Sequence, residues 1–178
     1  LMCLNGTGIL YNWLKRICQN EYEKMNQLAR KIPIGSYGLV FLPYGNGAER
    51  TLKDQNLGAL IYGLNFNIHN QAHLFRAGLE GVAFGLNYGL NIIERMGLKI
   101  KTIKAGYANM FLNSTFAKIL ASITRTSIEL YNTDGAQGAA RGAGVGAGVF
   151  KNYQEAFRGL KKIKTISPDY KNLAIYQE

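Results

Sequence analysis

The sequence predicts an α/β protein, because segments with the pattern of β-strands alternate with segments of helical periodicity. A long amphipathic stretch from about Asn70 to Met96 repeats apolar residues at helical spacing, and Gly97 follows where glycine commonly ends a helix. The stretch Lys99–Ala121 combines an alternating strand, a turn of small residues and a second amphipathic helix. With 178 residues and no visible internal repeat, the chain has the length of a single domain, residues 1–178.

The first part of the chain predicts two helices and two strands before the long helix. Apolar residues recur at positions i, i+3, i+4 and i+7 between Gly8 and Cys18, which predicts the first helix. A second helical stretch begins near Tyr22, and Pro33 and Gly35 break it. Apolar runs and loop composition then predict a buried strand at 38–42, an irregular loop at 43–56 and a strand at 59–63.

After the long helix, the pattern predicts a strand that begins at Lys99, a turn over Ala105–Asn109 and a helix. Apolar residues at 116, 119, 120 and 123 would face the core from that helix. A short strand over Ser127–Tyr131 and a terminal helix around Glu155–Leu160 complete this part. The small residues of the turn let a ligand approach the backbone, as loops after strands do in nucleotide-binding α/β proteins.

A glycine-rich helix is expected from about Asp134 to Lys151, although each internal glycine costs ~1 kcal/mol relative to alanine. Asp134 would cap its N-terminus. Gly138, Gly142 and Gly146 share one face, which favours tight packing against a neighbouring element over direct contact with a ligand. No G-x-G-x-x-G fingerprint follows a strand, so a Rossmann dinucleotide site is not expected.

The formal net charge of +10 indicates an anionic partner or a solvated basic face. Basic clusters lie around Lys15, Lys99 and Lys161, but no recognised nucleic-acid motif accompanies them, so the solvated face is favoured and nucleic acid is not expected. In the long loop, the pair Glu49-Arg50 and the nearby Asp54 could meet a substrate or a partner lobe. A surface ion pair of negligible value is the more ordinary interpretation of these charges.

Neither a membrane span nor a signal peptide is expected. The longest candidate for a span, residues 142–150, is short and rich in glycine, whereas a span needs ~20 apolar residues. Leu1–Leu4 lacks the basic flank of a signal peptide and meets Asn5-Gly6 at once. The cytoplasm is therefore the expected location.

Known catalytic and metal-binding signatures are missing or incomplete. His69 and His73 have the i, i+4 spacing of a zinc-protease helix, but Asn70-Gln71 occupies the place of the required glutamate, and no third ligand is evident. Cys3 and Cys18 have neither zinc nor redox spacing, so they are expected to be buried or idle thiols in a reducing compartment. The chain holds no P-loop and no G-x-S-x-G motif.

Several segments together resemble the carboxy-terminal lobe of the FGGY carbohydrate kinases, in the right order along nearly the whole chain. Leu42–Thr51 is similar to the family's L-P-Y-x-x-G-E-R-T segment, with one residue added. Ala59–Glu80 resembles its strand, Gly-Leu pair, spacer and His-led helix, although Gly78 stands where the family prefers a slightly larger residue. Asp134–Ala140 is similar to its E-G-A-A-L-G-A-A helix start.

The resemblance implies an actin/hexokinase-like (ribonuclease H-like) lobe, a mixed sheet with flanking helices, truncated on its N-terminal side. In such kinases two lobes close over ATP and a sugar, and residues 1–178 would form most of the carboxy-terminal, nucleotide-side lobe. The missing N-terminal lobe would carry the D-x-G-T phosphate loop and most of the sugar pocket, and the general-base aspartate would also lie upstream. This chain would then hold no catalytic residue and no metal ligand, and alone it would be inactive.

Two of the five residues that the resemblance implies as ATP contacts lie near the start of the chain. Gly8–Leu14 resembles the family's G-x-x-x-Q-W-L-R helix entrance. By that match Gly8 would lie against the nucleotide, Asn12 would be the polar adenosine contact and Trp13 would be core. Asparagine is one methylene shorter than the family's glutamine, so the reach of this contact is reduced.

The other three lie in the turn Ala105–Asn109, which corresponds to the family's G-G-G-A-x-[SN] segment. Here the first glycine is Ala105, and the turn is one residue shorter. Gly106 would let the backbone lie against the nucleotide, and Asn109 could contact the adenosine or the phosphates.

The activity that the resemblance implies is ATP-dependent phosphorylation of a sugar hydroxyl by the full-length protein, with Mg²⁺ as the metal. The Leu-Pro-Tyr…Glu-Arg-Thr loop is most similar to that of the xylulose kinase branch, which favours D-xylulose as substrate and D-xylulose 5-phosphate as product. Two alternatives stay open: a kinase-like regulator or scaffold without catalysis, and a basic nucleic-acid-binding module. The expected partners are the sugar, ATP and the missing lobe, with a homodimer as an open option.

Overall fold

The computed structural model describes residues 3–176, which form six α-helices and two separate β-sheets joined by loops and short 3-10 turns. The helices are α1 (Thr7–Ile17), α2 (Tyr22–Lys31), α3 (Gln71–Arg95), α4 (Ser114–Thr124), α5 (Gly135–Gly146) and α6 (Tyr153–Ala156). The strands are β1 (Val40–Leu42), β2 (Leu60–Tyr62), β3 (Thr102–Gly106), β4 (Ser127–Tyr131) and β5 (Lys162–Ile166).

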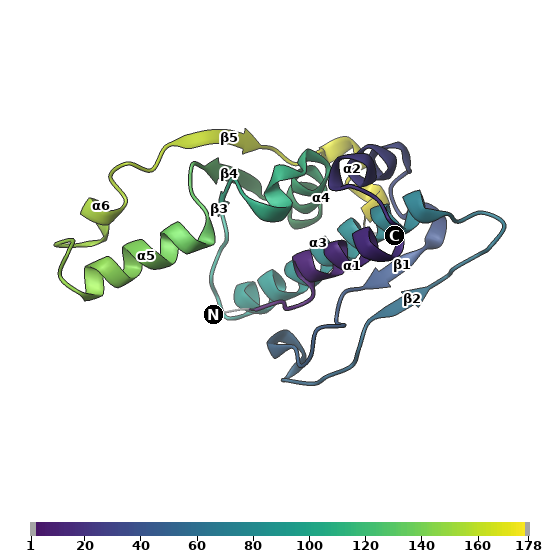
Figure 1. Cartoon of the computed structure of the whole chain (residues 1–178), viewed down its shortest axis with the longest axis horizontal. Helices are drawn as coiled ribbons and strands as arrows, with labels where there is room; N and C mark the ends of the chain where they lie inside the picture. The colour runs from purple at the N-terminus through teal and green to yellow at the C-terminus, as the bar shows by residue number, and fades with distance from the viewer. Residues whose placement is uncertain (1–2, 177–178) are drawn as a thin grey trace.

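The two sheets lie on opposite sides of the helices. Figure 1 shows the sheet β3-β4-β5 along the top of the molecule with α4 beside it, and the hairpin β1-β2 at the lower right next to α3. The helices α1 and α2 lie near α3, whereas α5 and α6 extend to the left, beyond the end of the larger sheet (Figure 1). Segments distant in sequence therefore meet around α3.

The larger sheet is mixed, as the sequence predicts. β3 and β4 are parallel, in register from Thr102 opposite Ser127 to Gly106 opposite Tyr131. β5 runs antiparallel to β4, with a shift of register between Leu130 and Tyr131. On its other side, β3 has no neighbouring strand among residues 3–176.

The core is built around α3. Phe75, Leu79 and Val82 are fully buried on one face of this helix, and apolar residues of α1, α4 and β4 join the same cluster. Gly81 allows α3 to approach β1 very closely, because a Cβ at Gly81 would lie 1.9 Å from the backbone oxygen of Phe41. The C-terminal half of α3 is less buried than its periodicity predicts.

The N-terminus of α3 is fixed by a reciprocal cap. The side-chain oxygen of Asn70 accepts a hydrogen bond from the Ala72 N–H at 2.9 Å, and Nδ1 of His73 accepts one from the Asn70 N–H at 3.2 Å. His69 accepts from the Asn65 N–H at 3.0 Å. Burial and the neighbouring His69 lower the pKa of His73 below its usual value. Both histidines therefore order the turn that leads into α3.

Two strand predictions need correction. β3 begins at Thr102 and not at Lys99, and it runs through Ala105 and Gly106, where a turn was expected. Parallel pairing with β4 sets these limits, and no single-strand pattern contains that register. The strand predicted as buried at 38–42 is β1, in which only Phe41 is buried, because one face of the hairpin lies open to solvent.

The glycine-rich helix also differs from its prediction. α5 ends at Gly146, and the predicted terminal helix is the single turn of α6, after which comes the unpredicted β5. Within residues 3–176, a Cβ at Gly138, Gly142 or Gly146 would meet no atom within 4 Å, so no described residue packs tightly against this face as expected. Asp134 does cap α5, accepting from the Gln137 N–H at 2.8 Å.

Other expectations are confirmed or fall at the edge of the description. The predicted strand Ser127–Tyr131 is β4 without a change of boundary. Cys3 is exposed and Cys18 partly buried, both as free thiols, and burial raises the pKa of Cys18. The signal-peptide prediction rests in part on Leu1 and Met2, which lie outside the described residues. Within residues 3–176, no helix combines the length and the apolar character needed to cross a bilayer.

Candidate functional site

A cleft of about 920 Å³ lies where four parts of the chain meet. Its wall is formed by the start of α1, one side of α2, the middle of α3 and the turn that follows β3. Its lining residues are Asn5, Thr7, Gly8, Ile9, Tyr11, Tyr22, Asn26, Val82, Leu86, Gly106, Ala108, Asn109, Met110, Phe111, Leu112, Asn113, Phe116, Asp134 and Gly135. This volume lies in the range of sites that hold small molecules.

The cleft brings together three of the five residues singled out in the sequence. Gly8, Gly106 and Asn109 all line it, although about a hundred residues of sequence separate the first from the other two. Asn12 and Ala105 are not among the lining residues. The roles of all five as nucleotide contacts remain predictions.

Gly8 lies in the first turn of α1, at the rim of the cleft. A Cβ at this position would meet no atom within 4 Å, so the space beside Gly8 is open. The N-cap residue of α1 is Gly6, and no side chain caps the helix. The first backbone N–H groups of an α-helix have no partner within the helix, and they carry the positive end of its dipole. The cleft therefore borders free backbone donors.

Gly106 lacks a side chain for a reason other than the expected contact between its backbone and a nucleotide. A Cβ there would lie 2.4 Å from the backbone oxygen of Thr133, so the glycine is needed for packing against the segment that leads into α5. The Tyr107 N–H still donates to the Tyr131 oxygen of β4 at 2.8 Å, and the backbone then turns sharply, with the Ala108 N–H donating to the Gly106 oxygen at 2.9 Å. Asn109 has a φ of 50°, in the left-handed region that asparagine tolerates better than most residues.

Asn12 and Ala105 lie outside the lining of the cleft, and Trp13 differs from its expected burial. Asn12 is exposed, and its side-chain oxygen accepts from the Tyr22 hydroxyl at 3.1 Å. Ala105 packs against the core, because alternation along β3 turns it away from the cleft. Trp13 is 37% exposed, with its ring edge-on to Phe41, so its assignment to the core is wrong.

Sequence reasoning missed a hydrogen-bonded group in the cleft wall. The side-chain oxygen of Asn26 accepts from the Tyr11 hydroxyl at 3.0 Å and from Nδ2 of Asn113 at 2.7 Å. Burial raises the pKa of Tyr11, which keeps its hydroxyl protonated as a donor. These two bonds fix the orientation of the Asn26 amide, whose nitrogen has no protein partner within residues 3–176. No motif marks Tyr11 or Asn26, which meet only when α1 and α2 pack.

The lining is nearly uncharged. It contains no lysine, arginine or histidine, and its one carboxylate, Asp134, is occupied by the N–H and side-chain amide of Gln137. Aromatic rings of Tyr11 and Tyr22 stack with centroids 6.0 Å apart beside it. Aromatic faces and amide groups suit a flat, neutral, hydrogen-bonding molecule such as a nucleoside. They do not provide the cations that a triphosphate needs.

The long loop holds the start of α1 in place through Glu49. This carboxylate is fully buried, and its two oxygens accept from the Asn5 N–H at 3.1 and 3.0 Å. The Asn5 amide in turn donates to the Ala48 oxygen at 2.8 Å. The expectation of a surface ion pair at Glu49 is wrong: among residues 3–176 its partner is backbone, because the loop folds over the segment that precedes α1.

The match to a family model decides what this chain is. Residues 2–149 match the model for the C-terminal domain of the FGGY family of carbohydrate kinases. The chain belongs to the FGGY family of carbohydrate kinases. This confirms the resemblance found in the sequence, and it places the cleft in a family C-terminal domain.

Individual FGGY relatives agree with this assignment. Xylulose kinase of Bacillus subtilis is 30% identical over 94% of the chain, and L-xylulose/3-keto-L-gulonate kinase of Escherichia coli is 31% identical over 89%. The chain covers only 37% and 31% of those two proteins. It therefore spans about a third of the length of these kinases.

Solved structures confirm the actin/hexokinase-like α/β fold of this FGGY chain. The crystal structure of xylulose kinase from Rhodospirillum rubrum superposes with a TM-score of 0.76 and 26% identity over 99% of the chain, which is 36% of that structure. The crystal structure of ligand-bound xylulose kinase from Lactobacillus acidophilus superposes with a TM-score of 0.80 and 24% identity. The match covers 97% of this chain and 36% of that structure. That second likeness shows the fold alone.

Proposed function

We propose that the cleft binds the adenosine part of ATP, and that the full-length protein transfers the terminal phosphate of ATP to a sugar hydroxyl. The observation that carries this proposal is the meeting of Gly8, Gly106 and Asn109 around one nearly uncharged cleft. Free N–H groups of α1 and the amides of Asn26 and Asn109 supply donors for a nucleoside. The membership of a carbohydrate kinase family supplies the reaction class.

The remaining steps of catalysis are assigned to parts of the full-length protein beyond this chain. Phosphoryl transfer needs cations around the phosphates and a base that accepts the proton of the attacking hydroxyl. The cleft lining has no cation, so we assign the phosphate loop, most of the sugar pocket and the general-base aspartate to the N-terminal lobe.

Mg²⁺ is the metal we propose for the reaction, held by the triphosphate and the other lobe. Among residues 3–176, no three His, Cys, Asp or Glu side chains gather as ligands for a metal ion. The residues present therefore do not fit a metal site of their own. We therefore assign the magnesium site to the complete enzyme.

D-Xylulose is the sugar that we propose first, with D-xylulose 5-phosphate as product. The relatives named xylulose kinase support it, as does the resemblance of Leu42–Thr51 in sequence to the Leu-Pro-Tyr…Glu-Arg-Thr loop. The cytoplasm is the proposed location, and a homodimer is a further option for the intact protein. A kinase-like regulator is the second candidate. Asn12 and Ala105, which the family pattern implies as nucleotide contacts, do not line the cleft.

A coupled kinase assay on the full-length protein tests both candidates. D-Xylulose, L-xylulose, D-ribulose, glycerol and gluconate are offered with MgATP, and turnover with D-xylulose at the highest kcat/KM is expected. Gly8→Leu is expected to raise the KM for ATP at least about tenfold, because the side chain fills open space in the cleft. Gly159→Leu, where the space is also open but outside the cleft, is the matched control.

The outcomes separate the candidates. ATP binding that Gly8→Leu weakens, without turnover of any sugar, would identify the regulator. Equal KM values for ATP in the wild type and Gly8→Leu would show that the cleft does not bind the nucleotide. Steeply salt-dependent binding of DNA or RNA without any effect of ATP would favour a nucleic-acid module instead.

A further inference from the structure

A second cavity borders other residues of the helices that flank the cleft. It has a volume of about 390 Å³ and is bordered by α2, α3, α4, β5 and the segment that ends the described chain. None of its lining residues lines the cleft. The two cavities are therefore separate sites, and nothing in the proposed kinase reaction uses this second one.

Basic side chains from four different elements converge on this cavity. Arg30 of α2, Lys118 of α4 and Lys164 of β5 line it, together with Arg76 of α3. Among residues 3–176, none of the first three is in an ion pair. One acid, Asp169, also lines the cavity, and its oxygens accept from the Lys171 N–H and the Asn172 amide. The cavity is thus strongly positive, in contrast to the cleft.

Arg76 is the fixed part of this arrangement. Arg76 is only 7% exposed. Its Nε donates to Glu80 at 2.7 Å, and its Nη2 donates to the Tyr176 hydroxyl at 2.9 Å. Within residues 3–176, Nη1 has no hydrogen-bond partner, and the cavity is the open space that this side chain borders. A buried guanidinium held by two partners thus keeps a donor available for a molecule in the cavity.

The start of α4 adds a second feature that favours negative charge. Ser114 and Thr115, in the first turn of this eleven-residue helix, line the cavity. The Asn113 side chain caps this helix by accepting from the Thr115 N–H at 2.9 Å and the Phe116 N–H at 3.3 Å, so the first turn contributes side-chain hydroxyls rather than free backbone donors. The hydroxyls of Ser114 and Thr115 can donate to an oxygen-rich anion beside them.

We propose that this cavity binds the phosphate group of a small phosphorylated metabolite. A guanidinium fork, three further cations and two hydroxyl donors are groups that recognise phosphate in proteins. The volume suits a small molecule, whereas a nucleic acid needs an extended groove along its backbone. The proposal is independent of the kinase reaction, because the site shares no residue with the cleft.

The test measures anion binding to the full-length protein by calorimetry. Inorganic phosphate and glucose 6-phosphate are titrated separately, with sodium chloride at matched ionic strength as the reference. Saturable binding of one of them is expected, and which of the two binds more tightly tells free phosphate from a phosphate ester. Saturating ATP is expected to leave this binding unchanged, because the nucleotide is assigned to the cleft.

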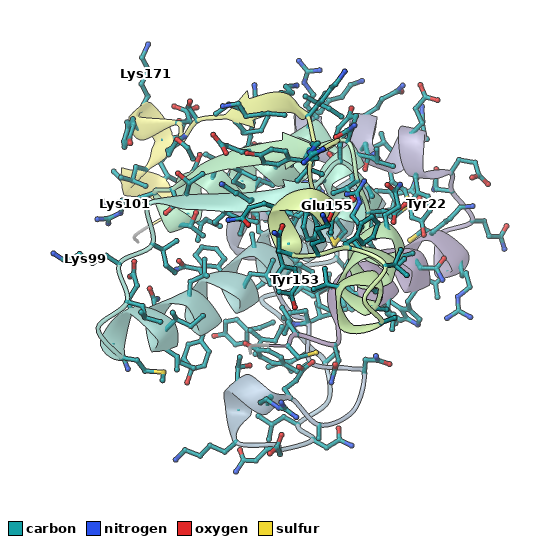
Figure 2. The ribbon with its side chains drawn as sticks, turned by 90° about the vertical axis from the view of Figure 1, so that its left-hand side faces the viewer. Tyr22, Lys99, Lys101, Tyr153, Glu155 and Lys171 are labelled. Carbon is teal, nitrogen blue, oxygen red and sulfur yellow. The ribbon has the colours of Figure 1, made fainter. Side chains whose placement is uncertain are left out.

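Arg30 and Lys164 are exposed, so replacing them should leave the folding of the protein unchanged. Arg30→Ala and Lys164→Ala are each expected to weaken phosphate binding at least about tenfold, with unchanged thermal stability. Lys99→Ala removes the same charge elsewhere, since Lys99 extends outward from the α3–β3 loop in Figure 2 and does not line this cavity. It is expected to bind phosphate as the wild type does.

Three results would overturn the proposal. They are no saturable binding of either anion, an equal loss of binding in Lys99→Ala, and displacement of the anion by ATP. The second result would indicate a general effect of net charge. The third would show that the anion binds in the cleft. Absence of kinase activity would leave these measurements unaffected, so this proposal and the proposed function fail separately.

Discussion

Gly8 and Gly106 lack a side chain for different physical reasons, although the family motifs treat both as places where backbone meets a nucleotide. Space beside Gly8 is open, whereas a Cβ at Gly106 would strike the backbone of Thr133. The sequence identifies both glycines but contains nothing that separates the two causes. The difference appears only when the turn after β3 packs against the segment that leads into α5.

Alanine substitutions at these two glycines are expected to have opposite effects on stability. Gly106→Ala should lower the free energy of unfolding by about 2 kcal/mol, because backbone must shift to admit the new methyl group. Gly8→Ala should leave it unchanged or raise it by up to ~1 kcal/mol, since alanine is the better helix residue. Urea denaturation of both variants measures the difference, and equal losses would contradict it.

His73 should make stability depend on pH. Its pKa is lowered in the folded state, so the unfolded chain binds more protons as the pH falls below 6.5, and the free energy of unfolding decreases. Protonation also removes the acceptor for the Asn70 N–H. His73→Gln keeps a residue suited to the capping box but cannot titrate. Denaturation at pH 7.5 and 5.5 should show a smaller loss for this variant than for the wild type.

Polar residues that act through long-range contacts were the least predictable part of the site. Asp134 was correctly predicted as a cap because capping is local in sequence. Asn26 and Glu49 find their partners 15 and 44 residues away, across packed elements. A single sequence carries no local signal for such pairs. Sequence reasoning therefore overlooks Asn26 and assigns Glu49 to a surface ion pair.

At the scale of elements, the close contact between α3 and β1 determines where the hairpin lies. Gly81 is the residue that permits it, since a Cβ there would overlap the backbone oxygen of Phe41. Gly138 on α5 is the opposite case, because the space around it is open. Gly81 thus sets packing in α3, whereas Gly138 only weakens helix propensity in α5.

Alanine at these helical glycines tests that contrast. Gly81→Ala is expected to destabilise the protein by about 3 kcal/mol, because α3 and β1 must move apart. Gly138→Ala should instead stabilise it by ~0.5–1 kcal/mol through helix propensity. Thermal unfolding of the two variants provides the comparison. A stable Gly81→Ala protein would show that the hairpin is held elsewhere.

The sequence locates most of the helices, the central strand and both hairpin strands, whereas it misplaces β3 and misses β5. Periodicity locates α1, α3 and α4 because each buries one continuous face. β4 is central, so its own pattern of alternate burial matches its limits. β3 and β5 take their limits from pairing with β4, and β5 is largely exposed, which leaves almost no hydrophobic signal in its sequence.

In the proposed function, the whole molecule presents one wall of a reaction centre. Its cleft has donors and aromatic faces for a nucleoside, but its lining holds no cation for the phosphates. The chain covers 37% of the B. subtilis relative, so the groups for phosphate and sugar are expected in the remainder of the full-length protein.

The 178-residue chain by itself is therefore expected to show no sugar kinase turnover. A coupled assay with D-xylulose and MgATP should give a rate indistinguishable from the blank, while the full-length protein turns over under the same conditions. Substantial activity of the isolated chain would mean that the residues described here include a complete catalytic set.

The outer edge of β3 has a practical consequence for work with this chain. Within residues 3–176 this edge carries backbone N–H and C=O groups that no strand pairs, and such edges add strands from other molecules. Lys104 is one charge on this strand that opposes such pairing. At high concentration, the isolated chain should join edge to edge into oligomers that scatter light, and a dimer seen in that preparation would report on the edge rather than on the enzyme.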